Sequence, residues 1–200
     1  LSIGTAGTAA SMKTKTEDSI EGTYLEVENS EIKEFKLIGC DIGTTIEVGS
    51  LFYNIPARKK DLGSVSFEFS KILNIVTRYA VINTAISFSL YHNDRKVLFA
   101  PKSKSLLDKI ANIYGKEIAK EMIPIDYKSQ LFCLEGFISK PILTRNSRDM
   151  QSIYVNKRYV RSKEIMDYVY ESYHTLLHSD RNPIVVLDFR ISPRFIDVNV

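Results

Sequence analysis

Residues 43–60 read GTTIEVGSLFYNIPARKK, and the pattern of the sequence changes across this stretch. Near its start, the β-branched residues at 44–48 lie between two glycines, which predicts a strand. Beyond its end, apolar residues recur at helical offsets, and Ser66 stands where a helix N-cap is expected. These apolar residues are Phe69, Ile72, Leu73, Val76 and Ala80. The sequence therefore predicts a domain boundary near Gly63, which separates residues 1–63 from residues 64–200.

The region before this boundary has the pattern of a sheet. Strand-like segments at 24–27 and 32–38 are separated by Asn29-Ser30, a pair that is typical of a tight turn. Together with the strand at 44–48, these segments predict a β-meander, in which consecutive strands are neighbours.

The region after the boundary mixes strands and helices. Residues 86–90 alternate apolar and polar side chains before Asn93-Asp94, which predicts a hairpin with residues 96–99. A helix is predicted at 106–114, with Gly115 at its end. The other predicted elements are strands at 131–138, 153–155 and 159–160, a helix at about 162–178, and strands at 183–189 and 195–200. This order predicts an α+β fold in which a mixed sheet is layered with helices.

The composition is that of a folded globular protein. The chain has 200 residues and a mass of 22.8 kDa, with 44% hydrophobic and 26% charged residues, which excludes a disordered tail, a collagen or a disulfide-rich miniprotein. No apolar run approaches the roughly 20 residues that cross a bilayer. No leader precedes Leu1, so we expect an intracellular location, cytoplasmic or, in a eukaryote, nuclear. Cys40 and Cys133 are far apart in the sequence, which favours structural thiols over a metal or redox motif.

Charge is distributed unevenly, although the formal net charge is only +3. Residues 1–50 carry four basic and nine acidic side chains, whereas residues 140–163 carry seven basic side chains and one acidic side chain. A basic run of this kind either binds a polyanion or simply solvates a surface, and the composition leaves both interpretations open.

Several chemistries lack their motifs in this chain. It has no phosphate-cradling Gly-x-x-x-x-Gly-Lys loop, no Gly-x-Gly-x-x-Gly turn and no Gly-x-Ser-x-Gly elbow. His174 and His178 lie four residues apart on a predicted helix, but no third metal ligand is evident. The sequence therefore predicts neither a metal site nor a self-contained set of catalytic residues.

Three motifs carry a resemblance to a known family. Residues 43–60 resemble the signature stretch of the MutL-type DNA mismatch repair proteins, which belong to the GHKL ATPases. Residues 154–161, YVNKRYVR, resemble the family's Val-Asn-Gly-Arg turn, and DVNV at 197–200 resembles its end-strand motif. The motifs occur in the family's order, and the resemblance spans essentially the whole chain.

The resemblance implies two domain types. The last strands of a Bergerat-type ATPase domain would extend to Gly63, and a transducer domain of the ribosomal-protein type, built on a βαβ arrangement, would follow at residues 64–200. In such proteins ATP binding closes a dimer and hydrolysis resets it. Thr44 matches a residue beside the adenine edge of ATP. The residues to which the resemblance gives a structural role are Gly43, Asn54, Pro56 and Arg58.

ATP and Mg²⁺ are cofactors that the resemblance implies for the parent protein. The family's Mg²⁺-binding Glu/Asn helix, adenine loop, glycine-rich lid and catalytic lysine have no counterpart in these 200 residues. Because positioning and charge neutralisation supply most of the catalysis of phosphoryl transfer, we expect this chain to hold no cofactor and to hydrolyse no ATP.

The implied partners are DNA, a MutS-type mismatch recognition protein, and a second copy or a paralogue of the parent. Lys157 stands where the family has Gly, which predicts a different backbone geometry because Gly commonly serves positive φ. Tyr154 and Tyr159 fit core or cross-strand positions better than base stacking. No recognition helix is visible, so contacts with the DNA backbone are expected. The candidate residues for these contacts are Arg145, Arg148, Lys157, Arg158, Arg161 and Lys163.

Two alternatives remain open on the sequence. The transducer region of a type II topoisomerase B-type subunit joins the same two domain types, and the run FYNIPAR at 52–58 favours mismatch repair over it. A non-enzymatic RNA-binding or scaffold module rests on the ribosomal-type domain alone, and it leaves the acidic sheet before Gly63 unexplained.

Overall fold

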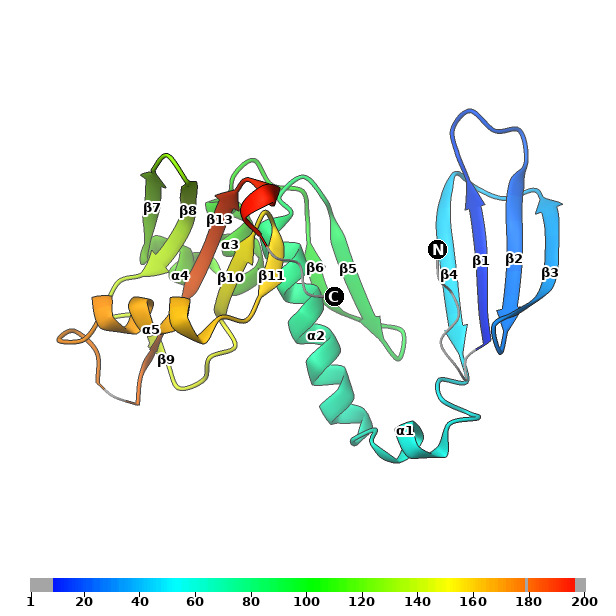
Figure 1. The fold of residues 1–200 in the computed structure, drawn as a ribbon, viewed down its shortest axis with the longest axis horizontal. Helices are drawn as coiled ribbons and strands as arrows, with labels where there is room; N and C mark the ends of the chain where they lie inside the picture. The colour runs from blue at the N-terminus through cyan, green and yellow to red at the C-terminus, as the bar shows by residue number, and fades with distance from the viewer. Residues whose placement is uncertain (1–8, 179, 197–200) are drawn as a thin grey trace. The chain divides into compact units, whose positions relative to one another are not determined.

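The computed structural model describes residues 9–178 and 180–196 (Figure 1). The chain divides into two compact units, the first ending at Glu68 and the second beginning at Phe69. The end-strand motif at 197–200 lies outside the described residues.

The first unit contains a four-stranded antiparallel sheet. Its strands, in the spatial order β3-β2-β1-β4, are β1 (Ala9–Lys15), β2 (Gly22–Glu28), β3 (Glu31–Ile38) and β4 (Gly43–Gly49). The predicted turn at Asn29-Ser30 joins β2 to β3, and both residues have positive φ, 52° and 67°. The meander prediction is wrong for β4, because β1, a strand that the apolar pattern did not reveal, lies between β2 and β4.

One face of this sheet is apolar. The strand register sets Met12 between Leu25 and Ile46, and Phe35 lies opposite Leu25 on the same face. Phe35, Ile46 and Val48 are each more than half exposed. Because a sheet is stable when its apolar face packs against a second layer, this face has the character of a buried layer rather than of a solvated one.

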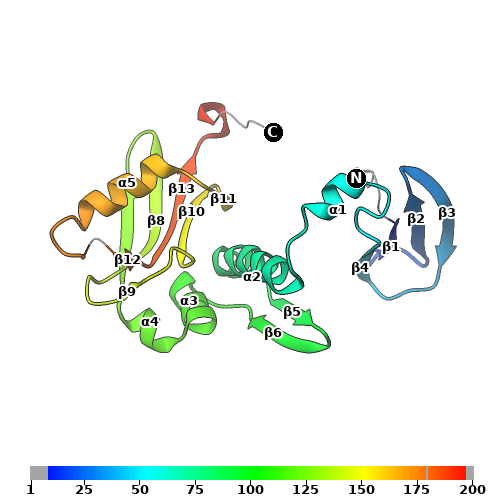
Figure 2. The same ribbon diagram turned by 90° about the horizontal axis from the view of Figure 1, so that it is seen from below.

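The second unit is a five-stranded mixed sheet with helices on both faces (Figure 2). From one edge to the other its strands are β11 (Arg158–Val160), β10 (Gln151–Val155), β13 (Val185–Ile191), β8 (Phe132–Ser139) and β7 (Met122–Lys128). Only β10 and β13 run parallel, and α5 (Lys163–Ser172) crosses between them, which forms a βαβ unit. These findings confirm the predicted α+β fold with a mixed sheet and a central strand near residues 183–189.

The other elements of the second unit surround this sheet. The helices on the face opposite α5 are α2 (Val65–Ile82), which crosses the boundary between the units, α3 (Leu106–Tyr114) and α4 (Lys116–Lys120). The predicted hairpin is formed by β5 (Phe88–His92) and β6 (Arg95–Ala100), and β9 (Thr144–Arg145) pairs with β12 (Asn182–Pro183).

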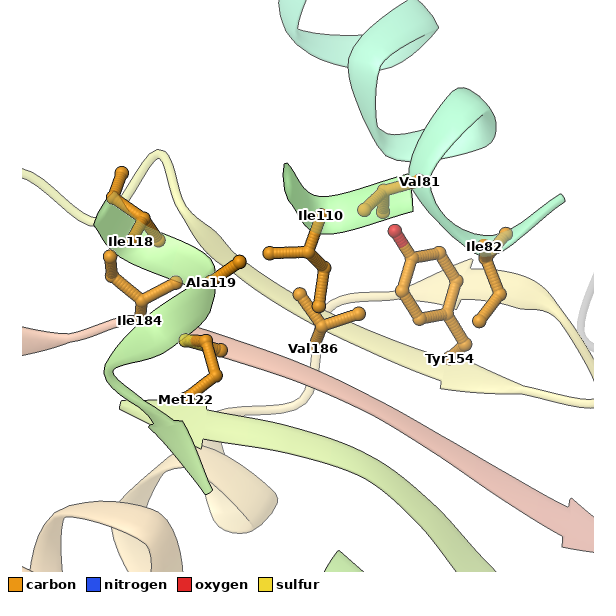
Figure 3. Packing of buried hydrophobic residues seen from close by; sticks show 9 residues of the cluster. All are labelled: Val81, Ile82, Ile110, Ile118, Ala119, Met122, Tyr154, Ile184 and Val186. Carbon is orange, nitrogen blue, oxygen red and sulfur yellow. The ribbon is translucent and has the colours of Figure 1, made fainter. Parts of the chain in front are cut away.

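Two apolar clusters fix the sheet between its helices. In the larger cluster, Tyr154 of β10 and Val186 of β13 pack against Val81 of α2 and Ile110 of α3 (Figure 3). On the other face, side chains of β10 and β13 pack against Ile165 and neighbouring residues of α5. Successive residues of β10 therefore point to opposite clusters, as the period of two in a strand requires.

Several elements differ from the sequence prediction. The helix expected to reach residue 178 ends at Ser172, because Tyr173 turns the chain and donates its buried hydroxyl to the carbonyl of Ser139. A 3₁₀ turn, η1 (Pro193–Phe195), includes the first residue of the strand predicted at 195–200, and residues 197–200 of that prediction lie outside the described residues. The strand β7, which the sequence did not predict, contains Pro124, and its edge position is where a sheet tolerates proline.

Lys109 of α3 is buried, with an exposed fraction of 0%. Its ammonium donates to three backbone carbonyls, those of Ile86 at 2.8 Å, Ala100 at 3.1 Å and Pro101 at 2.6 Å. Burial lowers the pKa of the Lys109 side chain. The side chain therefore ties α3 to both ends of the β5–β6 hairpin.

Replacement of this lysine is expected to destabilise the second unit. Lys109→Met keeps the length of the side chain but leaves three buried acceptors without their donor, which we expect to cost about 3 kcal/mol of unfolding free energy. The measurement is urea unfolding followed by tyrosine fluorescence, since the chain has no Trp. The control Lys104→Met, at an exposed lysine in the same region, leaves the midpoint in place. Equal midpoints for the two variants would contradict the assigned role.

Three tyrosines, of which Tyr154 and Tyr173 are buried and Tyr114 is half-buried, make stability depend on alkaline pH. Burial raises the pKa of Tyr114, Tyr154 and Tyr173 above the ordinary value of 10.0. These hydroxyls stay protonated in the folded chain while the unfolded chain ionises, so their stabilising contribution is full below pH 10 and is lost as the pH rises above it. We expect the urea midpoint to fall between pH 9 and pH 11, and Tyr154→Phe to reduce that fall relative to the exposed-site control Tyr168→Phe. A midpoint that stays constant over this range would refute the prediction.

Candidate nucleic-acid interface

The basic run forms an exposed edge on the second unit. Lys157, Arg158, Arg161 and Lys163, here named the basic edge, are all exposed. Lys157 lies in the β10–β11 turn, Arg158 is the first residue of β11, Arg161 follows the last residue of β11, and Lys163 is the first residue of α5. Because β11 is the outermost strand of the sheet, one side of its backbone is open to solvent. No acidic residue stands within residues 150–163, and the exposed Glu164 follows directly after Lys163, so the charge of the edge is mainly positive.

The β10–β11 turn has left-handed backbone geometry. Asn156 and Lys157 have φ of 50° and 65°, the conformation that Gly commonly supplies in a two-residue hairpin turn. The prediction that Lys157 would force another geometry is therefore wrong. The physical reason is a hydrogen bond, because the N–H of Lys157 donates to the carboxylate of Asp188 at 3.0 Å.

Arg145 and Arg148 lie away from this turn. They precede β10, whereas the turn follows it, so the length of β10 separates them from Lys157. Arg145 is half-buried on β9 and donates to the carbonyl of Thr144 at 3.0 Å. Arg148 is exposed, and its guanidinium lies 5.4 Å from the centre of the Tyr170 ring. Neither residue belongs to the basic edge, although β11 runs back toward Arg148 and brings Arg161 to that end.

A groove of about 900 Å³ adjoins the basic edge. It lies beside α2, and Lys71, Arg78 and Arg161 line it together with one acidic residue, Asp149. Its charged lining is therefore mainly positive, which extends the positive surface from β11 toward α2.

Arg78 was not singled out by the sequence pattern, yet it connects α2 to the β10–β11 hairpin. It is buried, and its guanidinium donates to the carbonyl of Gln151 at 2.7 Å and to the side chain of Asn74 at 2.5 Å. The guanidinium also stacks 4.2 Å from the centre of the Tyr159 ring. The sequence shows only that an arginine stands in a segment with a helical apolar pattern. That pattern does not distinguish an arginine that joins two elements from one that is exposed to solvent.

The two tyrosines of the hairpin are packing residues. Tyr154 is fully buried and donates to the backbone carbonyl of Arg78 at 2.7 Å. Tyr159 lies opposite it across the strands, with ring centres 6.2 Å apart in an edge-on arrangement. The prediction of core and cross-strand roles is confirmed for both.

The motif stretch at the end of the first unit makes local contacts there. The side-chain amide of Asn54 donates to that of Asn29 at 2.7 Å, which attaches the segment to the β2–β3 turn. Pro56 opens the short helix α1 (Pro56–Lys60), and the guanidinium of Arg58 lies 5.8 Å from the centre of the Phe52 ring. These contacts fit a structural role for the segment.

Thr44 lies on β4 with its hydroxyl 2.8 Å from that of Thr14 on β1. The strand register puts both on the apolar face of the sheet. Gly43, which precedes it, has φ of 125°, and a side chain there would be strained.

No metal centre is found in the described ranges 9–178 and 180–196, since no three His, Cys, Asp or Glu side chains group there. His174 and His178 follow the end of α5, so the helical spacing expected for them does not hold. Within the same described ranges, no helix combines the length and apolar character needed to cross a membrane.

Comparisons with known proteins identify the relatives of this chain. The family described as "DNA mismatch repair protein, C-terminal domain" matches residues 110–200. The DNA mismatch repair protein MutL of Desulforamulus reducens is 36% identical over 189 residues, which cover 94% of this chain and 30% of the relative. The chain thus spans about a third of the length of the curated relatives it matches.

Solved structures share the fold. The crystal structure of the N-terminal domain of a DNA repair protein superposes with a TM-score of 0.82 at 26% identity, over 96% of this chain and 62% of that one. The MutL ATPase domain of Aquifex aeolicus complexed with ADP superposes with a TM-score of 0.74 at 22% identity, over 93% of this chain and 68% of that one. The sequence relatives favour mismatch repair over the topoisomerase alternative. The chain therefore belongs to the MutL-type family of DNA mismatch repair proteins.

Proposed function

We propose that the second unit binds the DNA backbone through the basic edge. The observation that carries this proposal is that four exposed cations stand within residues 157–163, from the turn before the edge strand β11 to the first residue of α5, with no acidic residue among them. Cations held together on one surface release counterions when they meet phosphates, and this release supplies most of non-specific DNA affinity.

The shape of the edge supports backbone contacts over base reading. The basic residues stand on a two-residue turn, a three-residue strand and the start of a helix that packs against the sheet. Side chains that read bases usually project from a helix or a long β-ribbon that enters a groove. The binding is therefore sequence-nonspecific in this proposal.

The first unit contributes the end of a nucleotide-binding sheet in the same proposal. Its exposed apolar face carries Thr44, and a second layer of the whole protein would cover that face and enclose ATP with Mg²⁺. The related Aquifex domain was solved with ADP, which supports nucleotide binding in the family. In the whole protein, ATP would gate a dimer, a homodimer or a heterodimer with a paralogue, that links a MutS-type mismatch recognition protein to later repair steps.

The experiment is a fluorescence anisotropy titration of labelled duplex DNA at several salt concentrations. Four phosphate contacts predict that log affinity falls with log salt with a slope of about −3 to −4. Two duplexes of equal length and different sequence should bind equally well, and structured RNA should compete less than duplex DNA. An affinity that does not change with salt concentration contradicts the proposal. A preference for structured RNA over duplex DNA also contradicts it and would favour the RNA-binding alternative.

A further inference from the structure

The turn that carries the first cation of the basic edge is attached to the end of β13. Asn156 donates its backbone N–H to the carbonyl of Phe189 at 2.8 Å. Its side-chain amide donates to the carbonyl of Ile191 at 2.8 Å and accepts the N–H of the same residue at 3.0 Å. The side chain of Asn156 therefore pairs with Ile191 in the way that a neighbouring strand residue would.

Asp188 provides a second attachment. Its carboxylate accepts the N–H of Lys157 at 3.0 Å, and the residue is 4% exposed. Among the residues that the structure describes, it is the only acidic one that is buried. Burial of a carboxylate is unfavourable without hydrogen bonds, so this side chain is suited to hold a backbone donor in place.

These bonds stabilise a turn that has left-handed backbone at a lysine. Left-handed backbone is strained for a residue such as Lys157, and strain of this kind persists where the surroundings over-determine the conformation. A turn fixed in this way presents Lys157 and Arg158 in one orientation. Preorganised contacts lose less conformational entropy on binding, so a fixed turn binds phosphate more tightly than a mobile one.

We infer that Asn156 and Asp188 are positioning residues for DNA binding. They hold the basic turn against β13 and do not themselves contact the phosphates. The inference rests on the proposed function, since it assigns two further residues to the same interface. It predicts that freeing the turn weakens DNA binding while the second unit stays folded.

The first test is Asn156→Gly. Glycine accepts the left-handed backbone, so the turn still closes, but both side-chain bonds to Ile191 are lost. We expect duplex DNA affinity, measured by anisotropy, to fall roughly three- to tenfold and the salt slope to decrease by about one. The matched control is Asn93→Gly in the β5–β6 turn, where Asn93 and Asp94 have similar φ of 47° and 61° away from the basic edge. This control should leave DNA affinity unchanged.

The second test compares Asp188→Asn with Asp188→Ala, which change the charge equally. Asparagine keeps an oxygen acceptor for the N–H of Lys157, so it should retain DNA affinity within about twofold, whereas alanine should lower it as Asn156→Gly does. Hydrogen exchange of the Lys157 amide gives an independent readout, with protection kept in the asparagine variant and lost in the alanine variant. Should Asp188→Ala fail to fold, Asn156→Gly carries the test alone.

The outcomes separate the inference from the proposal on which it rests. If folded Asn156→Gly binds duplex DNA with the same affinity and the same salt slope as the unaltered chain, the inference is overturned and the proposed function stands. Absence of DNA binding by the unaltered chain overturns the proposed function and the inference with it.

Discussion

Replacing Arg158 and Arg161 together with glutamate lowers the affinity of the chain for duplex DNA roughly a hundredfold at low salt. Arg158 is the first residue of the short strand β11, and Arg161 follows its last residue, about 10 Å further along an extended chain. The substitution removes two attractive charges and introduces two repulsive ones at the same positions. The salt slope should decrease by about two, because two phosphate contacts are lost.

The control for this variant carries the same change in charge elsewhere. Lys102→Glu with Lys104→Glu alters two exposed lysines in the segment between β6 and α3. If net charge alone determined binding, the two double variants would weaken it equally. We expect the control to weaken it severalfold at most, with urea midpoints of all proteins alike, and equal losses of affinity would refute the basic edge as the interface.

Gly136→Ala destabilises the second unit by about 3 kcal/mol or more, the range of the most severe single substitutions. Gly136 lies in β8, inside the five-stranded sheet, with φ of 147°. A Cβ at this position would overlap the carbonyl oxygen of Val186 and lie 2.9 Å from the Cα of Leu187, and both are backbone atoms that cannot rotate away. The sheet would have to separate β8 from β13 to accommodate one methyl group.

Urea unfolding followed by far-UV circular dichroism measures this loss. The matched control is Gly39→Ala, since a Cβ at Gly39 meets no atom within 4 Å. It should shift the unfolding free energy by less than about 0.5 kcal/mol. An unchanged midpoint for Gly136→Ala would show that β8 and β13 are not packed as closely as the structure has them.

The sequence predicted those elements whose signals are local. The hairpin around Asn93-Asp94, the helix that Gly115 ends and the turn at Asn29-Ser30 all formed as expected, because turn and cap residues act on their immediate neighbours. The end of α5 was not predictable in this way. It depends on the hydroxyl of Tyr173 reaching Ser139, a contact that only the folded sheet creates.

The candidate site also combines features that are encoded locally with features that depend on the folded sheet. The density of positive charge at 157–163 is visible in the sequence, and so is the hairpin that displays it. The separation of Arg145 from the turn depends on the direction of β10 and on the pairing of β9 with β12, and neither is encoded locally. The role of Asp188 could not be predicted from the sequence either, because its hydrogen-bond partner Lys157 is 31 residues away.

Lys157 illustrates how a local rule is overridden. A lysine in the second position of a two-residue turn argues against left-handed backbone, since its side chain adds strain. The structure keeps the turn because bonds from Asn156 and Asp188 to β13 and Lys157 offset that strain. Lys157 therefore contributes a cation to the edge from a position with left-handed backbone.

Arginine footprinting tests the central claim most directly. The chain would be treated with phenylglyoxal in the presence and absence of duplex DNA, and the modified arginines would be identified by mass spectrometry. We predict that DNA protects Arg158 and Arg161 and leaves the exposed Arg95 on β6 as reactive as before. Protection of Arg95 with full reactivity at Arg158 and Arg161 would contradict the account.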